Sequence, residues 1–357
     1  MTLDIPRYRL HNQFLSQTDF TDPAQVVKCL SAVQSQEYAG AKWALGLRLK
    51  EATDAGLDKA FNDGKILRTH VLRPTWHFVA PEDIRWMLKL TGPRVHAVNG
   101  FIYRQVELDS TIIKKSYAVF EKALQGNNQL TRTELGTALE QAGIKNAQGV
   151  RLAYFMMSAE LDGIICSGAR KGKQFTYALL EERVPKVKTL TRDEALVELT
   201  RRYFATRGPA TLYDFTWWSG LTMADARKGI DAVTSEFQQE TISEQTYWFP
   251  ATTPLKKPLS VAYLLPNYDE YTVGYRDRRA IFDGTHIDKL SAFRESILTQ
   301  VIIVNGEISG TWKRTIKKNE VRIELAPFTT LKKAASQGIL TAAQRYGKFM
   351  QLPVTLA

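Results

Sequence analysis

One segment in the middle of the chain restricts the fold most strongly, because it has the pattern of two helices followed by two short strands. Thr131-Arg132-Thr133-Glu134 is a capping box, so a helix is expected to begin there. A second helix is expected over 150–161, where apolar residues recur at helical spacing. The stretches 164–168 and 173–179 are typical of strands that flank a tight turn. This order predicts a winged helix, with the second helix in the recognition position.

The turn of this hairpin carries the cations Arg170, Lys171 and Lys173. A charged hairpin tip is often simply solvated. Three cations beside a recognition helix also suit contacts with DNA phosphates, so both interpretations stay open.

The segment 190–250 repeats the plan and opens with a second capping box, Thr191-Arg192-Asp193-Glu194. The elements expected after it are an aromatic helix over 211–220, a helix over 223–237 and strands over 239–243 and 245–250. Trp217 and Trp218 of the aromatic helix are candidates for stacking on exposed bases. Core packing is the stronger interpretation for both, because a helix of this motif must turn large apolar side chains inward.

Gln34 and Gln36 lie where two segments of helical periodicity meet, one over 23–33 and one over 38–49. On a continuous helix, side chains two residues apart point about 200° apart and cannot act on one target. On a bent or extended junction they point the same way. The alternative is that both amides cap helix ends or face solvent. Glu37 is a candidate general base, but it suits the first turn of the second helix better.

The stretch 69–79 is rich in β-branched and aromatic residues and is expected to be extended, with an interruption at Pro74. His70, Arg73 and His77 are candidates for groups that face a DNA cleft. The alternative is a histidine whose hydrogen bonds are satisfied within a strand or turn.

The last part of the chain, after a proline-rich linker over 250–258, is predicted to be mainly β. Strands are expected over 260–265, 299–304, 308–314 and 321–325, with a final helix over 330–352. Asn305-Gly306 predicts a tight hairpin. A second hairpin, 315–320, is strongly cationic, and its candidate phosphate contacts are Lys313, Arg314, Lys317 and Lys318.

The fold class expected from these patterns is α+β, with tandem winged-helix (helix-turn-helix) units and a β-rich C-terminal portion. The chain of 357 residues is long enough for more than one domain. The expected units are 1–110 with the glutamine junction, 111–187, 188–258 and 259–357. Lys and Arg number 48 against 37 acidic residues, a formal net charge of +11. An excess of this size suggests a polyanionic partner such as duplex DNA, bound with strong salt dependence.

The two cysteines, Cys29 and Cys166, lie in apolar patterns with no histidine at ligand spacing, so buried thiols are expected and a metal site is not. No glycine-rich phosphate loop or nucleotide fingerprint occurs, so no cofactor is expected. The N-terminal residues have no apolar signal region, and no run of 18 apolar residues exists, so a cytoplasmic protein away from the membrane is expected. A monomer is expected as well.

Four blocks of sequence resemble the AlkZ/YcaQ-like DNA glycosylases, winged-helix proteins linked to excision of bulky alkylated purines. The blocks are the run from Ser31 to Leu45 around Gln34-Ser35-Gln36, the run Thr69 to His77 with its Arg-x-Thr-x-His pattern, the paired runs Leu264 to Tyr271 and Gly274 to Arg278, and the run Gly310 to Arg314. They cover nearly the whole chain in the family's order.

The resemblance implies that Gln34 and Gln36 are the two catalytic residues and that the fold holds three winged helices. Some relatives have Asp at the second position, so Gln36 places the chain in the Gln-x-Gln branch. It implies a DNA glycosylase that hydrolyses the N-glycosidic bond of bulky or cationic alkylated purines in duplex DNA, with Arg276 and Arg278 of the C-terminal signature among its DNA contacts. A non-catalytic winged-helix DNA-binding regulator is the alternative.

The chemistry of the two amides is consistent with this activity. Base release passes through an oxocarbenium-like transition state. A glutamine amide cannot act as a general base near pH 7, but its carbonyl can hold a water molecule and present a negative dipole to the sugar. Such help is adequate for a base that alkylation has made a good leaving group. No lysine stands out as a Schiff-base nucleophile, which predicts a monofunctional enzyme. Asp269 and Glu270 are expected to have structural roles, bonding the backbone or Arg276.

Overall fold

The computed structural model describes residues 3–187, 189–251, 262–282, 284–288 and 299–357. Its helices are α1 Ile5–Asn12, α2 Pro23–Leu30, α3 Tyr38–Gly46, α4 Asp54–Asn62, α5 Ile84–Gln105, α6 Ser110–Leu124, α7 Arg132–Gln141, α8 Gly149–Leu161, α9 Leu180–Arg183, α10 Arg192–Arg207, α11 Leu212–Ser219, α12 Met223–Val233, α13 Glu270–Val273 and α15 Lys333–Met350. Its strands are β1 Ala32–Gln34, β2 Leu67–Val71, β3 Arg73–Val79, β4 Leu130–Thr131, β5 Ile165–Ser167, β6 Thr176–Leu179, β7 Phe237–Ile242, β8 Gln245–Pro250, β9 Ala262–Leu265, β10 Val301–Val304, β11 Glu307–Ile316, β12 Val321–Pro327 and β13 Val354–Leu356. None of these helices is long and apolar enough to cross a membrane.

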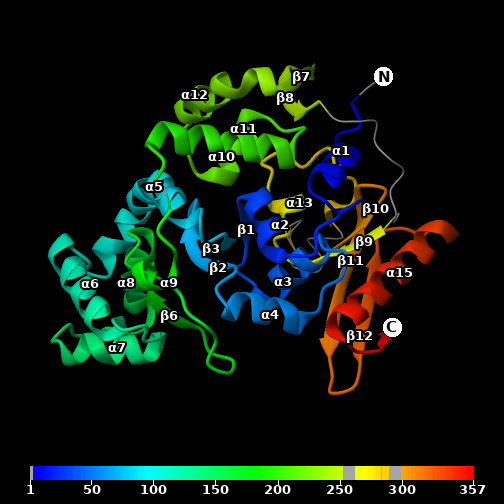
Figure 1. Cartoon of the computed structure of the whole chain (residues 1–357). Helices are drawn as coiled ribbons and strands as arrows, with labels where there is room; N and C mark the ends of the chain where they lie inside the picture. The colour runs from blue at the N-terminus through cyan, green and yellow to red at the C-terminus, as the bar shows by residue number, and fades with distance from the viewer. Residues whose placement is uncertain (1–2, 188, 252–261, 283, 289–298) are drawn as a thin grey trace.

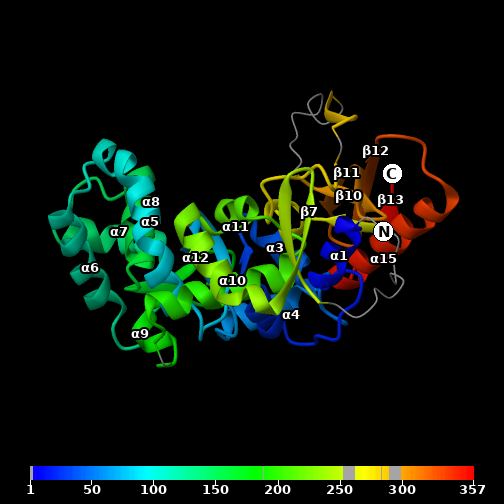
Figure 2. The same ribbon diagram turned by 90° about the horizontal axis from the view of Figure 1, so that it is seen from above.

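The strands form sheets of order β1-β3-β2, β4-β6-β5, β7-β8 and β13-β12-β11-β10-β9. All pairs are antiparallel except β12 with β13. The small sheet β1-β3-β2 lies in the middle of the molecule (Figure 1), with α6–α8 on one side and the five-stranded sheet with α15 on the other. Seen from above, these parts follow one another in a row, with α10–α12 between the two ends (Figure 2).

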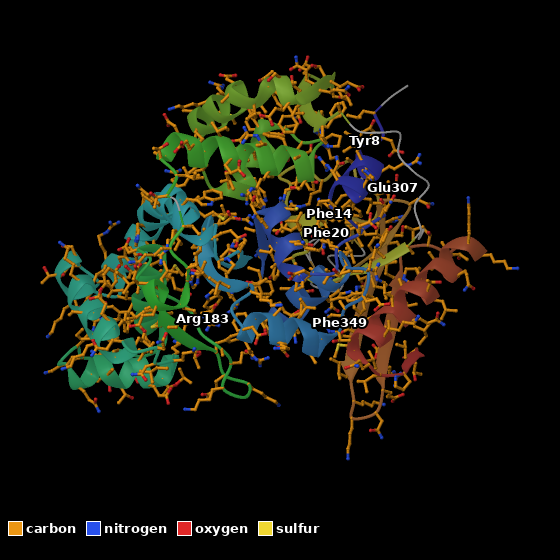
Figure 3. The ribbon with its side chains drawn as sticks, viewed as in Figure 1. Tyr8, Phe14, Phe20, Arg183, Glu307 and Phe349 are labelled. Carbon is orange, nitrogen blue, oxygen red and sulfur yellow. The ribbon has the colours of Figure 1, made fainter. Side chains whose placement is uncertain are left out.

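The buried apolar residues join parts of the chain that are far apart in sequence. One cluster combines α2 and α3 with the five-stranded sheet and α15, where Phe349 packs against Trp43 with ring centres 5.1 Å apart (Figure 3). A second cluster combines β2 and α5 with α10–α12. A third lies within residues 108–177 alone. Most of the buried apolar residues between 111 and 187 thus form a local cluster, although Cys166, Leu180 and Val184 belong to the second one.

Both predicted groups of helices and hairpins are present, and they begin where the sequence indicates. Thr131 and Thr191 each accept a hydrogen bond from the backbone of the glutamate three residues on, and each glutamate bonds back, so both capping boxes are confirmed. In the first group α7 and α8 are followed by β5 and β6. Helix α8 exposes mainly its first turn, where Val150 is 61% exposed, because residues 155–161 are buried against α5 and β2.

The stretch 69–79 is a tight hairpin rather than a single interrupted strand. The chain turns at Leu72, whose φ of 64° lies in the left-handed region, and β2 then pairs with β3. Pro74 is exposed, and β3 continues through it from Arg73 to Val79. The expected interruption at Pro74 was therefore wrong by two residues, because a positive φ at a leucine has no sequence signal.

In the C-terminal part the hairpin at Asn305-Gly306 is confirmed as the turn between β10 and β11. The expected strand over 260–265 is described from Ala262, and the expected linker over 250–258 lies for the most part outside the described residues.

Candidate active site around Gln34 and Gln36

The two glutamines lie on a short extended junction between helices. Helix α2 ends at Leu30, Ser31 adopts a φ of 63°, and the chain then enters β1. The Ser35 N–H donates to the Trp76 carbonyl at 2.8 Å, which prolongs the pairing of β1 with β3. The predicted non-helical junction is thus confirmed. Because side chains alternate along extended backbone, Gln34 and Gln36 leave the chain on the same side.

Strand β3 supplies the polar groups beside the glutamines. Gln34 pairs directly with His77 across the ladder, so their side chains share one face of the sheet. Alternation places Arg73 and Thr75 of β3 on that face as well. The structure therefore brings together both catalytic candidates and two of the three cleft candidates, Arg73 and His77. His70 is instead buried and bonds Glu160 of α8, which matches the alternative of a histidine satisfied within the fold.

Each glutamine carbonyl is anchored by a long hydrogen bond from β3. Arg73 Nη2 donates to Gln34 Oε1 at 3.3 Å, and the Trp76 N–H donates to Gln36 Oε1 at 3.4 Å. Gln34 is only 7% exposed, whereas Gln36 is open to solvent. Neither amide nitrogen has a hydrogen bond to a described residue. Each amide thus keeps an oxygen lone pair and two N–H groups for a ligand or a water molecule.

Glu270 fixes the backbone at Gln34. Its Oε1 accepts the Gln34 N–H at 2.9 Å, and its Oε2 accepts from Arg207 Nη2 at 2.6 Å and from the Trp218 indole at 2.9 Å. The side chains of Glu270 and Arg207 are both fully buried. A carboxylate 236 residues away thus determines where the first glutamine lies.

The neighbouring Asp269 forms a second buried ion pair, with Arg48 at 2.8 Å. The structural role expected for both acids is confirmed, but Arg276 is not their partner. Its backbone N–H donates instead to Asp214 at 2.9 Å, because the chain turns away from α13 after Gly274.

Arg73 and His77 differ in charge. Burial, and then the Arg73 cation, lower the pKa of His77 well below its usual value, so this histidine is neutral. Its Nδ1 donates to the Thr75 carbonyl at 2.9 Å, which leaves a lone pair on a buried Nε2 without a hydrogen bond to a described residue. Burial also lowers the pKa of Arg73. Among the described residues, Arg73 bonds oxygens of Gln34 and of the Trp217 backbone, and no carboxylate of this part of the chain lies within hydrogen-bond distance of it.

Glu37 caps α3 and is not placed as a general base. Its carboxylate accepts the N–H groups of Ala39 at 3.1 Å and Gly40 at 2.7 Å, and it pairs with Arg314 of β11 at 3.3 Å. Glu37 is thus the N-cap of α3, one residue before the first turn in which it was expected.

Comparison with known proteins identifies the family. The model of the family "DNA glycosylase AlkZ-like" matches residues 27–349. The chain belongs to the AlkZ-like DNA glycosylase family. An interstrand DNA cross-link repair glycosylase of Streptomyces sahachiroi is 22% identical over 330 residues, or 86% of each chain. The solved structure of the Streptomyces sahachiroi DNA glycosylase AlkZ superposes with a TM-score of 0.82 at 20% identity, covering 99% of this chain and 98% of that one. This AlkZ-like protein is therefore a DNA glycosylase, an enzyme of DNA repair that hydrolyses the N-glycosidic bond.

The cations at the first hairpin of this AlkZ-like glycosylase are partly engaged within the protein. Arg170 is half-buried, lies 3.2 Å from Asp58 of α4, and stacks over Tyr38 and Phe175. Arg183 of α9, labelled in Figure 3, also donates to the backbone carbonyls of Phe61 and Asn62 at the end of α4. Arg170 thus connects the β5–β6 hairpin to α3 and α4 instead of extending from the turn into solvent.

Lys171 and Lys173 are exposed at the turn itself, and Lys171 contacts Glu134 at 3.1 Å. The β11–β12 hairpin of the AlkZ-like fold extends away from the body (Figure 1). Lys313, Lys317 and Lys318 are exposed along it, with Lys317 lying 2.8 Å from Glu320. Arg314, two residues before β11 ends at the turn of the hairpin, is held by Glu37.

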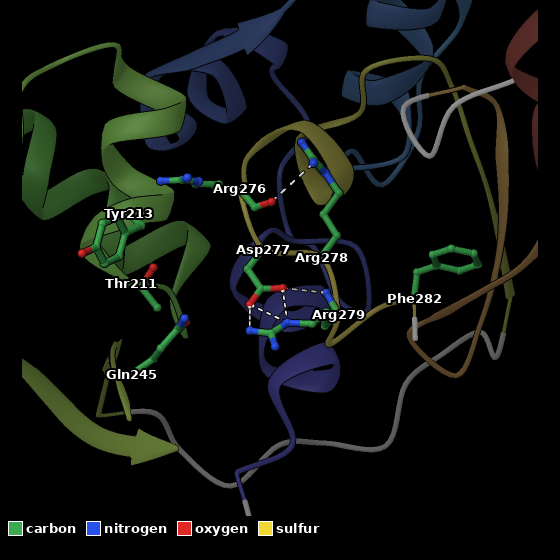
Figure 4. A pocket seen from close by; sticks show the side chains of 8 residues that line it. All are labelled: Thr211, Tyr213, Gln245, Arg276, Asp277, Arg278, Arg279 and Phe282. Carbon is green, nitrogen blue, oxygen red and sulfur yellow. Dashed lines mark hydrogen bonds and ion pairs between the residues drawn. The ribbon is translucent and has the colours of Figure 1, made fainter. Parts of the chain in front are cut away.

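Arg276 and Arg278 both line a cleft of about 700 Å³, and Arg276 lies beside Tyr213 there (Figure 4). Arg276 is exposed, while Arg278 is half-buried and donates to the Thr272 carbonyl at 2.8 Å. The two tryptophans of α11 separate. Trp218 is fully buried, as expected, but Trp217 is 40% exposed, so its assignment to the core was wrong. Neighbours on a helix point about 100° apart, and this rotation was the signal available in the sequence.

Within the described part of the chain, no cluster of His, Cys, Asp and Glu could hold a metal ion. Cys166 is buried, as expected, and burial raises its pKa to about 12. Cys29 is half-buried, and burial raises its pKa as well, so neither thiol is activated.

Proposed function

We propose that this glycosylase releases bulky or cationic alkylated purines from duplex DNA, and that Gln34 and Gln36 are its catalytic residues. The observation that carries the proposal is the shared face of the junction, on which both amide carbonyls are anchored by β3 while their remaining donors and acceptors stay open. The relative from Streptomyces sahachiroi is named for interstrand cross-link repair, which is consistent with a substrate alkylated at the purine.

The role of the amides follows from the charge of the reaction. An alkylated purine cation leaves with little proton donation, so the enzyme has to stabilise a cationic sugar and direct water to it. The exposed Gln36 carbonyl can orient the water, and the buried Gln34 carbonyl presents a fixed dipole to the sugar. A neutral His77 adds no positive charge beside the cation.

Arg73 requires an anion in such a site, because a lone guanidinium would oppose a cationic transition state. A DNA phosphate next to the lesion is the anion available, and it would replace the carboxylate that Arg73 lacks. Arg73 would then bind the backbone while it keeps Gln34 in place.

DNA binding in this proposal uses tandem winged helices. The order of α6, β4, α7, α8, β5 and β6, with β6 between β4 and β5, supports a winged helix, and α10–α12 with the β7–β8 hairpin supports a second. The exposed cations of the β5–β6 and β11–β12 hairpins are the proposed phosphate contacts, together with Arg276 and Arg278. The enzyme acts as a cytoplasmic monomer that needs no cofactor or metal.

The test is single-turnover release of base from a duplex containing N7-alkylguanine, read as strand breaks after heating in alkali. Gln36→Ala is expected to slow release about a hundredfold, the loss of one positioned group of about 3 kcal/mol. Gln36→Asp is expected to keep activity. Gln141→Ala, which removes an exposed amide from the end of α7, is the matched control.

Duplex affinity should stay within a few-fold of wild type in each variant, because the amides act on water and sugar rather than phosphate. Release by Gln36→Ala at the wild-type rate would exclude this junction as the catalytic site. Release from no alkylated duplex, even by the wild-type protein, would exclude the proposed substrate.

A further inference from the structure

Helix α11 presents two aromatic rings to solvent. Tyr213 is 54% exposed and Trp217 is 40% exposed, and both rank among the large apolar side chains that the described structure leaves open. They are four residues apart, so they lie next to each other on one face of the helix. The same helix buries Phe215 and Trp218 completely. The exposed rings are thus not needed for the core, which α11 already fills with its other aromatic residues.

Arginines surround these rings. The guanidinium carbons of Arg73 and Arg278 lie 5.8 Å and 5.5 Å from the centre of the Trp217 ring, and that of Arg276 lies 5.7 Å from the centre of the Tyr213 ring. Figure 4 shows Arg276 extending toward Tyr213. Arg94 of α5 is exposed and, with Tyr213, Trp217 and Arg276, lines a second cleft of about 530 Å³. No carboxylate is among the lining residues of this second cleft, whereas Asp277 lines the neighbouring cleft of about 700 Å³.

None of these four arginine side chains pairs with a carboxylate in the described parts of the chain. Arg73 and Arg278 bond backbone or amide oxygens, and the guanidinium groups of Arg94 and Arg276 have no hydrogen bond to a described residue. Such a group of unneutralised cations favours a polyanion over a protein surface of mixed charge.

The two exposed rings of α11 lie next to the candidate active site. Arg73 donates both to the Trp217 carbonyl at 3.4 Å and to Gln34 Oε1 at 3.3 Å, so one side chain connects them. The end of α11 also lies against the β2–β3 turn. A Cβ at Gly220, whose φ is 71°, would lie 2.3 Å from the Leu72 carbonyl oxygen, and only glycine permits this approach.

We propose that Tyr213 and Trp217 form a stacking site for unpaired DNA bases, whose phosphates are bound by Arg73, Arg94, Arg276 and Arg278. Aromatic rings that stack on bases beside cations that follow the backbone are the usual means of holding single-stranded DNA. This site deepens the proposed glycosylase function, since it would receive nucleotides that leave the helix next to the lesion. An aromatic pair without the arginines would suit a protein partner equally well. The surrounding arginines favour a nucleic acid over a protein partner.

The experiment measures binding of an undamaged single-stranded octanucleotide that contains 2-aminopurine, by anisotropy for affinity and by fluorescence quenching for stacking. Trp217→Ala and Tyr213→Ala are each expected to weaken binding about tenfold and to relieve quenching. Trp217→Phe should stay within a few-fold of wild type, because it keeps a ring. Phe101→Ala removes a ring that is 60% exposed on α5 and does not line this cleft, so it should change nothing.

The outcomes separate this site from the proposed catalysis. Wild-type affinity and quenching in both alanine variants would overturn the proposal, and so would an equal loss in Phe101→Ala. Tyr213→Ala tests the site independently should Trp217→Ala fail to fold. The undamaged strand has no base to release, so the catalytic assignment can fail in the Gln36→Ala experiment while strand binding remains.

Discussion

Replacing Glu270 by Gln tests whether the buried carboxylate positions the junction that we propose to be catalytic. Glu270 accepts hydrogen bonds from three groups that can only donate, namely the Gln34 backbone N–H, the Arg207 guanidinium and the Trp218 indole N–H. A glutamine in its place has one oxygen and one NH2 group. In either orientation the NH2 group meets a donor, so at least one of these bonds is lost and the charge of Arg207 is no longer neutralised.

The cost in stability follows from the partners that remain. Breaking a buried ion pair by removing one partner costs about 3–5 kcal/mol. Arg207 keeps the carbonyls of Leu30 and Ala32 and the Thr206 hydroxyl, each at 3.0 Å, so the lower end, about 3 kcal/mol, is expected. A domain with about 5–15 kcal/mol of stability stays folded after such a loss. Displacement of the Gln34 backbone should slow base release by about tenfold or more.

Asp269→Asn is the matched control. It breaks the adjacent Arg48–Asp269 pair, which is equally buried, but the Asp269 carboxylate bonds Arg48 and the Tyr271 N–H rather than either glutamine. The assay combines urea unfolding with single-turnover base release, well below the melting temperature of both variants. Both variants should lose comparable stability, while only Glu270→Gln slows release. Equal slowing by both would show that the effect is general loosening and would refute the positioning role.

Two further predictions concern DNA affinity and pH. The double variant Lys317→Ala and Lys318→Ala should weaken binding to every duplex sequence, and it should reduce the slope of log affinity against log salt by about 2. Anisotropy titrations at several salt concentrations measure this slope. An unchanged slope would mean that this hairpin does not touch phosphate. His77, whose pKa is lowered by burial, takes up a proton more readily when the protein is unfolded. Its contribution to stability is therefore complete above about pH 6.5 and falls by up to about 1.4 kcal/mol per pH unit below it, so urea unfolding should show a steeper acid loss for wild type than for His77→Gln.

The elements that sequence reasoning located correctly are those determined by local signals. The capping boxes at Thr131 and Thr191 and the Asn305-Gly306 turn each involve residues within a few positions of one another. Local hydrogen bonds of this kind form in almost any surroundings, which is why they can be read without the fold. The non-helical junction at Gln34 and Gln36 was also predictable, because the helical periodicity breaks there.

The supports of the active site could not be predicted, since they come from distant segments. Nothing near Gln34 in sequence indicates that Glu270 binds its backbone, or that Arg73 reaches both Gln34 and Trp217. The turn at Leu72, which brings Arg73 there, depends on a positive φ that leucine rarely adopts. These contacts are imposed by the packing of the central sheet against its neighbours.

The cations expected to bind DNA differ in a property that sequence cannot show, namely whether a carboxylate reaches them. Arg170 and Arg314 pair with Asp58 and Glu37 and hold segments of the protein together. Lys317 also pairs, but with an exposed glutamate, and an exposed pair contributes so little that a phosphate can replace it. The arginines around Trp217 have no carboxylate partner among the described residues. A formal charge of +11 therefore underdetermines the DNA path, and the unneutralised arginines are the reason for proposing that it runs along α11 and β3, beside the two glutamines.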